Sequence, residues 1–184
     1  MPPRGTATSA VPHYPLSHEG PVLVCGNAWC LHDDLSEAPK APIIAVNGAA
    51  GEVKASFLYS KHPERMVEKG GHWIQKQQRF HEDFTVHGSA FRRDMPWVDY
   101  WWESARGGGG SGWGARKLAS LLGFSTVILC GMPLEPGNYV SGLSKLMKNP
   151  DIIDNLRREI EADVEWHEGV TSMSGWTREF LCSP

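Results

Sequence analysis

Short apolar runs alternate with longer polar stretches along the first 130 residues of the chain. Each run has five or six residues and centres on aliphatic, β-branched or aromatic side chains. Continuous runs of this length are typical of strands buried on both faces, as in a parallel sheet covered by helices. The pattern therefore predicts a three-layer α/β domain with a mainly parallel sheet. The predicted strands are Pro21–Cys25, Pro42–Val46, Ser56–Ser60, Asp83–His87 and Ser125–Cys130.

The clearest unit is a helix that leads into the last predicted strand. Apolar residues recur with helical spacing between Gly112 and Gly123, and Gly123 is typical of a helix C-terminus. A second amphipathic helix is predicted from Pro150 to about Asp163, and a loop at Val170–Gly175 leads to a short C-terminal helix. In such a fold, ligands bind beyond the carboxyl ends of the strands, where helix N-termini also point.

The bulk composition, with 41% hydrophobic and 21% charged residues, is ordinary for one globular domain. Residues 1–20 are rich in Pro, Ser, Thr and Ala, so we expect a flexible leader there and one domain over residues 21–184. A net charge of −3 gives no global reason to expect nucleic acid or a membrane as partner. The apolar runs are far shorter than the roughly 20 residues of a membrane helix. Four cysteines without CxxC spacing indicate a reducing, cytoplasmic location and no structural metal.

A glycine-rich stretch, Gly107–Gly114, runs directly into the first predicted helix. Backbone N–H groups can converge there on an anion, with the positive end of the helix dipole behind them. Glycine suits such a loop because it admits positive φ and lets a phosphate approach the backbone. The alternative is a flexible linker. The predicted ligand-binding residues are Arg106, Gly110, Ser111, Gly112 and Arg116.

Polar residues follow the predicted strands at the same edge of the sheet. Asn27 follows the first strand and Asn47 the second, where their amides could bind the ring or ribose of a ligand. The alternative is that these Asn-Gly and Gly-Asn pairs simply make turns. His62 and His87 lie at the ends of the third and fourth strands and are candidates for a general base, although a lone histidine is more often structural.

The segment Phe91–Arg106 interleaves arginine with aromatic residues, and four of its aromatics fall within Trp97–Trp102. We favour a partly exposed lid over the ligand. The alternatives are a helix packed on the core and, with Arg92 and Arg93, a surface that stacks on nucleic-acid bases.

These landmarks together resemble a family. The order is a strand followed by Gly-Asn, a strand followed by a second Asn, and then Ser-Gly, a helix and a strand in Ser111–Leu134. This order is similar to that of the bacterial family 42 sialyltransferases and of the DUF115-type motility accessory and pterin-pyrophosphokinase-like proteins. The resemblance covers roughly Val22–Tyr139 and implies a Rossmann-like fold. Small proteins with the same late pattern also resemble products of tailed bacteriophages, which implies the cytoplasm of a bacterial host.

The resemblance also implies roles for particular residues. In the sialyltransferases the strand-end asparagines and the Ser-Gly pair hold a cytidine nucleotide, and a tyrosine after the final strand helps to bind phosphate. These roles carry over to Asn27, Asn47, Ser111, Gly112 and Tyr139. The chain departs from the family in three places. GNGPS reads GNAWC, the acidic residue that often follows the glycine after the final strand is replaced by Met132 and Pro133, and the loop that carries the family's general-base histidine reads VTSMSGWTREFL, without one.

The leading hypothesis is a nucleotide-dependent transferase that moves a glycosyl or phosphoryl-type group, with the donor phosphates held by Gly107–Gly114. His62 or His87 would deprotonate the acceptor. The first alternative is a non-catalytic phage protein that sequesters a nucleotide in counter-defence. The second is an interaction module that uses the Trp-rich segment. No cofactor is expected beyond the nucleotide or nucleotide-sugar ligand, and a homo-oligomer is left open.

Overall fold

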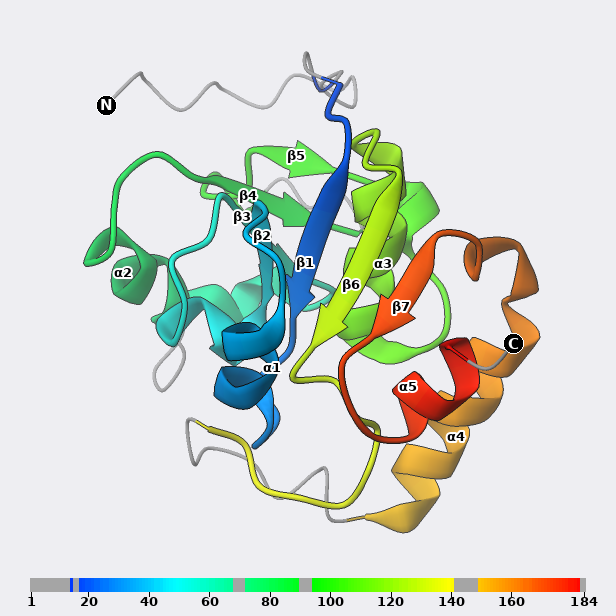
Figure 1. The fold of residues 1–184 in the computed structure, drawn as a ribbon. Coiled ribbons are helices and arrows are strands. Elements are labelled where there is room, and N and C mark those ends of the chain that lie inside the picture. The colour runs from blue at the N-terminus through cyan, green and yellow to red at the C-terminus, as the bar shows by residue number, and fades with distance from the viewer. Residues whose placement is uncertain (1–13, 15–16, 68–71, 90–93, 141–148, 183–184) are drawn as a thin grey trace.

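A computed structural model describes residues 14, 17–67, 72–89, 94–140 and 149–182 (Figure 1). Its centre is a sheet of seven strands in the order β5-β4-β3-β2-β1-β6-β7, in which every neighbouring pair is parallel. The predicted α/β, Rossmann-like architecture is therefore confirmed. The strands are β1 (Pro21–Cys25), β2 (Ile43–Val46), β3 (Phe57–Ser60), β4 (Thr85–Gly88), β5 (Tyr100–Trp101), β6 (Thr126–Cys130) and β7 (Val170–Ser172).

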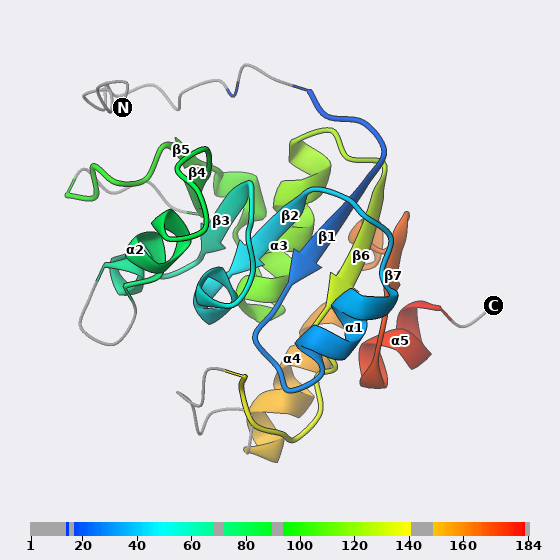
Figure 2. The ribbon, with the colours of Figure 1, turned by 60° about the vertical axis from the view of Figure 1, so that its left-hand side comes forward.

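Helices cover both faces of this sheet, as the two ribbon views show (Figures 1 and 2). The first two helices, α1 (Leu31–Glu37) and α2 (Trp73–Gln78), lie on one face. On the other face lie α3 (Gly110–Leu121) and α4 (Pro150–Ala162), while α5 (Gly175–Leu181) packs beside the edge strand β7. Short 3-10 helices complete the described chain: η1 (Asn47–Gly51), η2 (Pro63–Met66), η3 (Glu103–Ala105) and η5 (Val164–Trp166).

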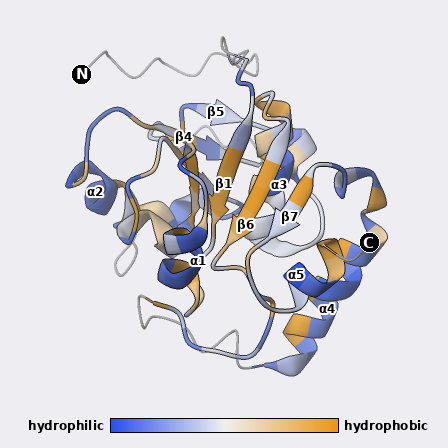
Figure 3. Cartoon of the chain, in the orientation of Figure 1, coloured by the Kyte–Doolittle hydropathy of each residue, from blue (hydrophilic) through white to orange (hydrophobic). Residues whose placement is uncertain are grey.

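The two faces of the sheet explain why the strands are uninterrupted apolar runs. In β1, Val22 and Val24 point into the core beneath α3, and Leu23 and Cys25 point into the core beneath α1. Because both faces are covered, neither set of alternate residues can be polar. The central strands are accordingly the most hydrophobic elements, and the outer helices are mostly hydrophilic (Figure 3).

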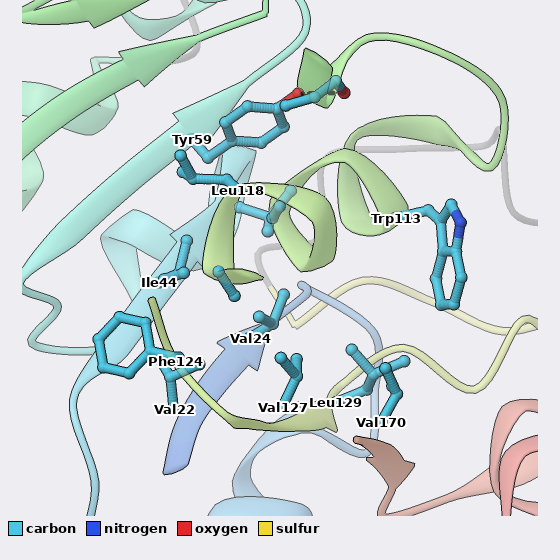
Figure 4. Packing of buried hydrophobic residues seen from close by; sticks show 14 of the residues in the cluster. Val22, Val24, Ile44, Tyr59, Trp113, Leu118, Phe124, Val127, Leu129 and Val170 are labelled. Carbon is cyan, nitrogen blue, oxygen red and sulfur yellow. Dashed lines mark hydrogen bonds between the residues drawn. The ribbon is translucent and has the colours of Figure 1, made fainter. Parts of the chain in front are cut away.

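Helix α3 lies unusually close to strand β3 at Gly114. A Cβ atom at this position would be 2.4 Å from the hydroxyl oxygen of Tyr59. That hydroxyl donates a hydrogen bond to the carbonyl of Ala105, at 3.1 Å. Tyr59 of β3 and two residues of the helix itself, Trp113 and Leu118, are all buried (Figure 4). The glycine thus lets the helix backbone rest on the sheet.

Two short edge strands were not expected from the pattern. Strand β7 occupies the first residues of the predicted loop Val170–Gly175, and β5 lies in the Trp-rich segment. Both are too short for alternation to be readable, and each is defined by hydrogen bonds to a longer neighbour, β6 or β4. Neighbouring strands therefore decide these two elements.

The described end of the expected leader packs against the core. The N–H of His18 donates to the carbonyl of Leu122 at 2.9 Å, and its ring stacks on Phe124 with 4.8 Å between centroids. The Tyr14 hydroxyl lies 2.9 Å from the His18 ring nitrogen Nε2. Tyr14 and residues 17–20 thus belong to the folded part of the chain.

A side chain at Gly114 tests the close approach of α3. We expect Gly114→Ala to lower the free energy of unfolding by about 1–3 kcal/mol, because its Cβ would overlap the Tyr59 hydroxyl. Urea denaturation measures this cost in the wild-type background and in Tyr59→Phe, where the hydroxyl is absent. The cost should be smaller in Tyr59→Phe by about 0.5 kcal/mol or more. Equal costs in the two backgrounds would contradict this account of the packing.

Candidate functional site

The two strand-end asparagines lie side by side at the carboxyl edge of the sheet. Cys25 pairs with Ala45 in the parallel register of β1 and β2. Asn27 and Asn47 each follow two residues later. The structure therefore places the two residues at equivalent positions, as the sequence pattern predicts.

Asn47 is held in an unusual conformation by its neighbours. Its φ is +52°, in the left-handed region that asparagine tolerates better than most residues. The buried Ser60 hydroxyl donates to the Asn47 Oδ1 at 2.7 Å and accepts from the N–H of His62 at 2.9 Å. Because Ser60 uses one lone pair of the amide oxygen, the second lone pair and the NH₂ group of Asn47 can still serve a ligand.

Met132 connects the end of β1 to the start of α3. A Cβ on Gly26 would be 2.4 Å from Met132 Cγ, and a Cβ on Gly112 would be 2.4 Å from Met132 Cε. The side chain therefore fills the space between two glycines, one of which precedes Asn27. This packing brings the first turn of α3 beside the strand ends.

The glycine-rich loop has the backbone geometry that only glycine adopts readily. Gly107, Gly109 and Gly110 have φ angles of +130°, +74° and +71°. The helix begins at Gly110, so Gly110, Ser111 and Gly112 form its first turn. The N–H groups of a first turn have no partner within the helix and point outward along its axis. The loop is an ordered part of the fold rather than a linker.

Lys61 joins this loop to strand β3, and sequence reasoning missed it. Its ammonium nitrogen donates to the carbonyl oxygens of Gly107 and Gly108, the second at 3.2 Å. Its backbone N–H lies 3.4 Å from the Ser111 hydroxyl oxygen. Burial lowers the pKa of Lys61, with Glu159 acting in the opposite direction. A partly desolvated ammonium with a third N–H is suited to an anionic ligand.

Glu159 of α4 contacts the glycine-rich loop, and the sequence pattern did not predict this contact. Its carboxylate accepts a hydrogen bond from the N–H of Gly109 at 2.5 Å. A Cβ on Gly108 would be 2.8 Å from Glu159 Cβ, so the loop rests on this side chain. A carboxylate is favoured at this position by the dipole of α3. One N–H of the predicted cradle is therefore used within the protein.

Tyr139 lies directly beside Asn27. Ala28 and Tyr139 form an antiparallel bridge, and the N–H of Val140 donates to the carbonyl of Asn27 at 2.9 Å. Burial raises the pKa of Tyr139, so its phenol remains protonated and able to donate. The structure thus brings together two residues that are 112 positions apart, 27 and 139.

His62 is exposed at the end of β3, next to Lys61. Its Nδ1 is 3.4 Å from a carboxylate oxygen of Glu64, and 62% of its side chain is accessible. A carboxylate at one ring nitrogen fixes the orientation of the ring and leaves the other nitrogen, Nε2, available for proton transfer. Glu64 is a further residue that the sequence analysis did not single out.

The structure corrects the expectation that His87 faces the ligand. The ring is fully buried beside the rings of Phe57 and Tyr100, and the Trp102 indole donates to its Nδ1 at 2.9 Å. Since an indole only donates, Nε2 carries the proton and donates to Thr85 Oγ1 at 2.7 Å. Burial, with a smaller effect of His18, lowers the pKa of His87 to about 3. This is a neutral core histidine without a free lone pair.

Arg116 does not face the loop as expected. Arg116 is buried, and its guanidinium donates to the carbonyl of Glu168 at 2.7 Å and to Ser120 Oγ at 2.8 Å. It therefore anchors the segment after α4 and does not serve the first turn of α3. Arg106 is exposed at the end of η3. Arg92 and Arg93 lie outside the described residues.

The Trp-rich segment forms an edge strand where we expected a lid. Trp101 is buried in β5 and lies against Gly88, where a Cβ would be 2.7 Å from the indole. Trp102 donates to His87, and Trp97 donates to the carbonyl of Pro63 at 3.3 Å. The aromatic rings are thus used in packing. The prediction was wrong because the amino acids that suit a lid also suit an edge strand.

Three further properties concern possible partners. Within the described ranges, every helix is too short or too polar to span a membrane. Among the same residues, no cluster of three or more His, Cys, Asp or Glu side chains is arranged to hold a metal ion. Cys25, Cys30 and Cys130 are buried free thiols, and Cys182 is an exposed one.

Comparison with solved structures identifies the fold. The sialyltransferase CstII from Campylobacter jejuni, solved with cytidine-5'-monophosphate, superposes with a TM-score of 0.54 at 14% identity, over 84% of this chain and 79% of its own. The monofunctional α-2,3-sialyltransferase Cst-I from the same organism gives 0.56 at 13% identity, over 94% and 81%. CstII with a trisaccharide acceptor and CMP gives 0.56 at 13% identity, over 89% and 88%.

At such low identity the likeness shows a shared sialyltransferase-like fold. No protein-family model matches the sequence, and no curated protein matches it significantly. The DUF115 resemblance and the phage origin remain predictions.

The burial of His87 predicts a specific acid sensitivity. The unfolded chain binds a proton at this residue with a pKa near 6.5, whereas the folded chain does so only near 3. Lowering the pH below about 6.5 therefore favours unfolding, and this one group should cost about 2 kcal/mol by pH 5. His87→Gln keeps both hydrogen-bonding functions but does not titrate. Urea denaturation at pH 7 and pH 5 measures how much of the free energy of unfolding is lost on acidification. This loss should be smaller in the variant than in the wild type by that amount. Equal losses would show that His87 is not the responsible group.

Proposed function

We propose that the protein is a nucleotide-dependent transferase of the glycosyltransferase type, with the nucleotide donor bound at the carboxyl edge of the sheet. The main support is that the first turn of α3, which includes Ser111, and Lys61 come together at the edge where Asn27 and Asn47 follow their strands. The solved structures that share this fold include sialyltransferases complexed with CMP.

Each part of the edge suits one part of a nucleotide. The N–H groups of Gly110, Ser111 and Gly112 and the Lys61 ammonium would hold the phosphate, since donors and positive charge meet there. The amides of Asn27 and Asn47 would bind the base or ribose. Tyr139 would donate its phenolic proton to a phosphate oxygen.

The same groups would stabilise the leaving nucleotide during glycosyl transfer. An acceptor hydroxyl oxygen forms a bond to the anomeric carbon, while the bond from that carbon to the phosphate oxygen breaks. The electron pair leaves with the nucleotide, whose added negative charge faces Lys61 and the α3 N-terminus. The proton of the acceptor hydroxyl goes to a general base. Of the two histidines considered, only His62, paired with Glu64, is accessible for that role.

The alternative of nucleotide sequestration shares the binding site and differs in the chemistry. Because His87 is buried, only His62 of the two candidate histidines can act as a general base. The loss of one candidate base gives this alternative some support. It predicts a tightly bound nucleotide that is recovered unchanged.

Nucleotide binding can be tested by thermal stability. CMP, CMP-sialic acid and other nucleotides and nucleotide sugars should be screened, and a true ligand at a hundredfold excess over its Kd should stabilise the protein by about 2.7 kcal/mol. Ser111→Trp should abolish the shift, because the indole would fill the first turn of α3. Ser36→Trp, the same change at an exposed position of α1, is the matched control and should keep it. The proposal is wrong if no nucleotide stabilises the wild type.

Turnover tests the role of His62. With the best donor and an acceptor glycan, His62→Gln should lower kcat by about 10²–10⁴-fold, the usual contribution of a general base, and leave the Kd of the nucleotide unchanged. Glu64→Gln should give a smaller loss, because it only orients the ring. Mass spectrometry of the products distinguishes transfer from sequestration. Undiminished turnover in His62→Gln would remove His62 from the mechanism.

A further inference from the structure

Trp29 is an exposed aromatic residue at the same edge of the sheet, and nothing above gives it a role. Its side chain is 50% exposed, although both neighbours in the chain, Ala28 and Cys30, are buried. It stands two residues after Asn27, in the turn between β1 and α1. A half-exposed indole leaves apolar surface in water that the ring of a ligand can cover.

The backbone around Trp29 is held firmly. The N–H of Ala28 donates to the carbonyl of Gly131 at 3.1 Å, and the N–H of Trp29 donates to the carbonyl of Asn138 at 3.0 Å. The bridge between Ala28 and Tyr139 lies next to this bond. The backbone that carries the indole is therefore hydrogen-bonded to the facing segment before any ligand arrives.

The indole has one packed edge and one open part. A Cβ on Gly137 would be 2.3 Å from Trp29 Cδ1 and 2.5 Å from Nε1, so the five-membered ring rests directly on the glycine backbone. The indole is therefore packed on this side, while half of the residue's surface remains exposed. A glycine at residue 137 is what allows this seating.

The size and chemistry of the open surface favour a sugar ring. A single exposed ring between two buried neighbours is too small for a protein interface, which requires a contiguous apolar patch. It matches one pyranose, whose face of C–H groups is attracted by the negative face of the indole. An uncharged hexose gains from this contact without needing a charged partner.

We propose that Trp29, seated on Gly137, is a platform for a neutral hexose ring of the acceptor glycan. This inference rests on the proposed function, because the nucleotide would occupy the neighbouring Asn27 and the first turn of α3. The acceptor would stack on the solvent side of the site and leave the rest of the glycan free. Trp29 would thus set which acceptors are used, while the donor site remains unchanged.

Saturation-transfer NMR with lactose and methyl β-galactoside, with and without CMP, tests the platform. Trp29→Ala should weaken sugar binding by about 10-fold, because the C–H face of the sugar loses its aromatic partner, and Trp29→Phe should keep most of it. Gly137→Ala should imitate Trp29→Ala, because its Cβ would displace the indole. Phe80→Ala, at an exposed aromatic outside the described site, should have no effect. The affinity for CMP should be the same in all four variants.

The outcomes separate this inference from the proposed function. If CMP binds and neither sugar does at high millimolar concentration, or if Trp29→Ala binds the sugars normally, the platform is refuted and the donor site stands. If the sugars bind through Trp29 but no nucleotide binds, the platform stands as a sugar site and the proposed function fails. An equal loss of CMP affinity in Trp29→Ala would place the residue in the donor site and overturn the inference.

Discussion

The contact between α3 and strand β3 is the constraint on which the candidate site depends. Because residue 114 has no side chain, the helix backbone can lie against Tyr59, whose hydroxyl in turn holds the carbonyl of Ala105. This seating places the first turn of α3 beside the end of β3. Only there can Lys61 reach the carbonyls of the glycine loop.

Charge is distributed so that the loop is ordered before it meets a ligand. Lys61 and Glu159 contact neighbouring parts of the loop, one through carbonyls and the other through an N–H. Nearby, the ammonium nitrogen of buried Lys117 lies 2.5 Å from a carboxylate oxygen of the partly buried Asp163, which also accepts a hydrogen bond from the Trp113 indole. These bonds lower the entropy that ligand binding would have to remove. In the proposed function, a phosphate would meet donors that are already in position.

The fold and the site carry different weight in the functional argument. A shared fold at 13–14% identity shows the architecture alone. In such sheets ligands generally bind where the strand ends and helix N-termini meet at one edge. The fold does not supply the chemistry, which depends on particular side chains. In the proposed function those are the accessible His62–Glu64 pair and the Lys61 ammonium, which lie on the single turn after β3, and the exposed Trp29.

The sequence by itself determined the parallel sheet, five of its seven strands, α3, α4 and the gathering of Asn27, Asn47 and Ser111 at one edge. Those features follow from local apolar runs and from the rule that parallel strands end together. Tertiary structure decided which way His87 and Arg116 face, what the Trp-rich segment becomes, and that Lys61 and Glu159 meet the loop. These outcomes depend on residues distant in the chain, such as Trp102, Glu168 and Gly108, and no local pattern encodes such contacts.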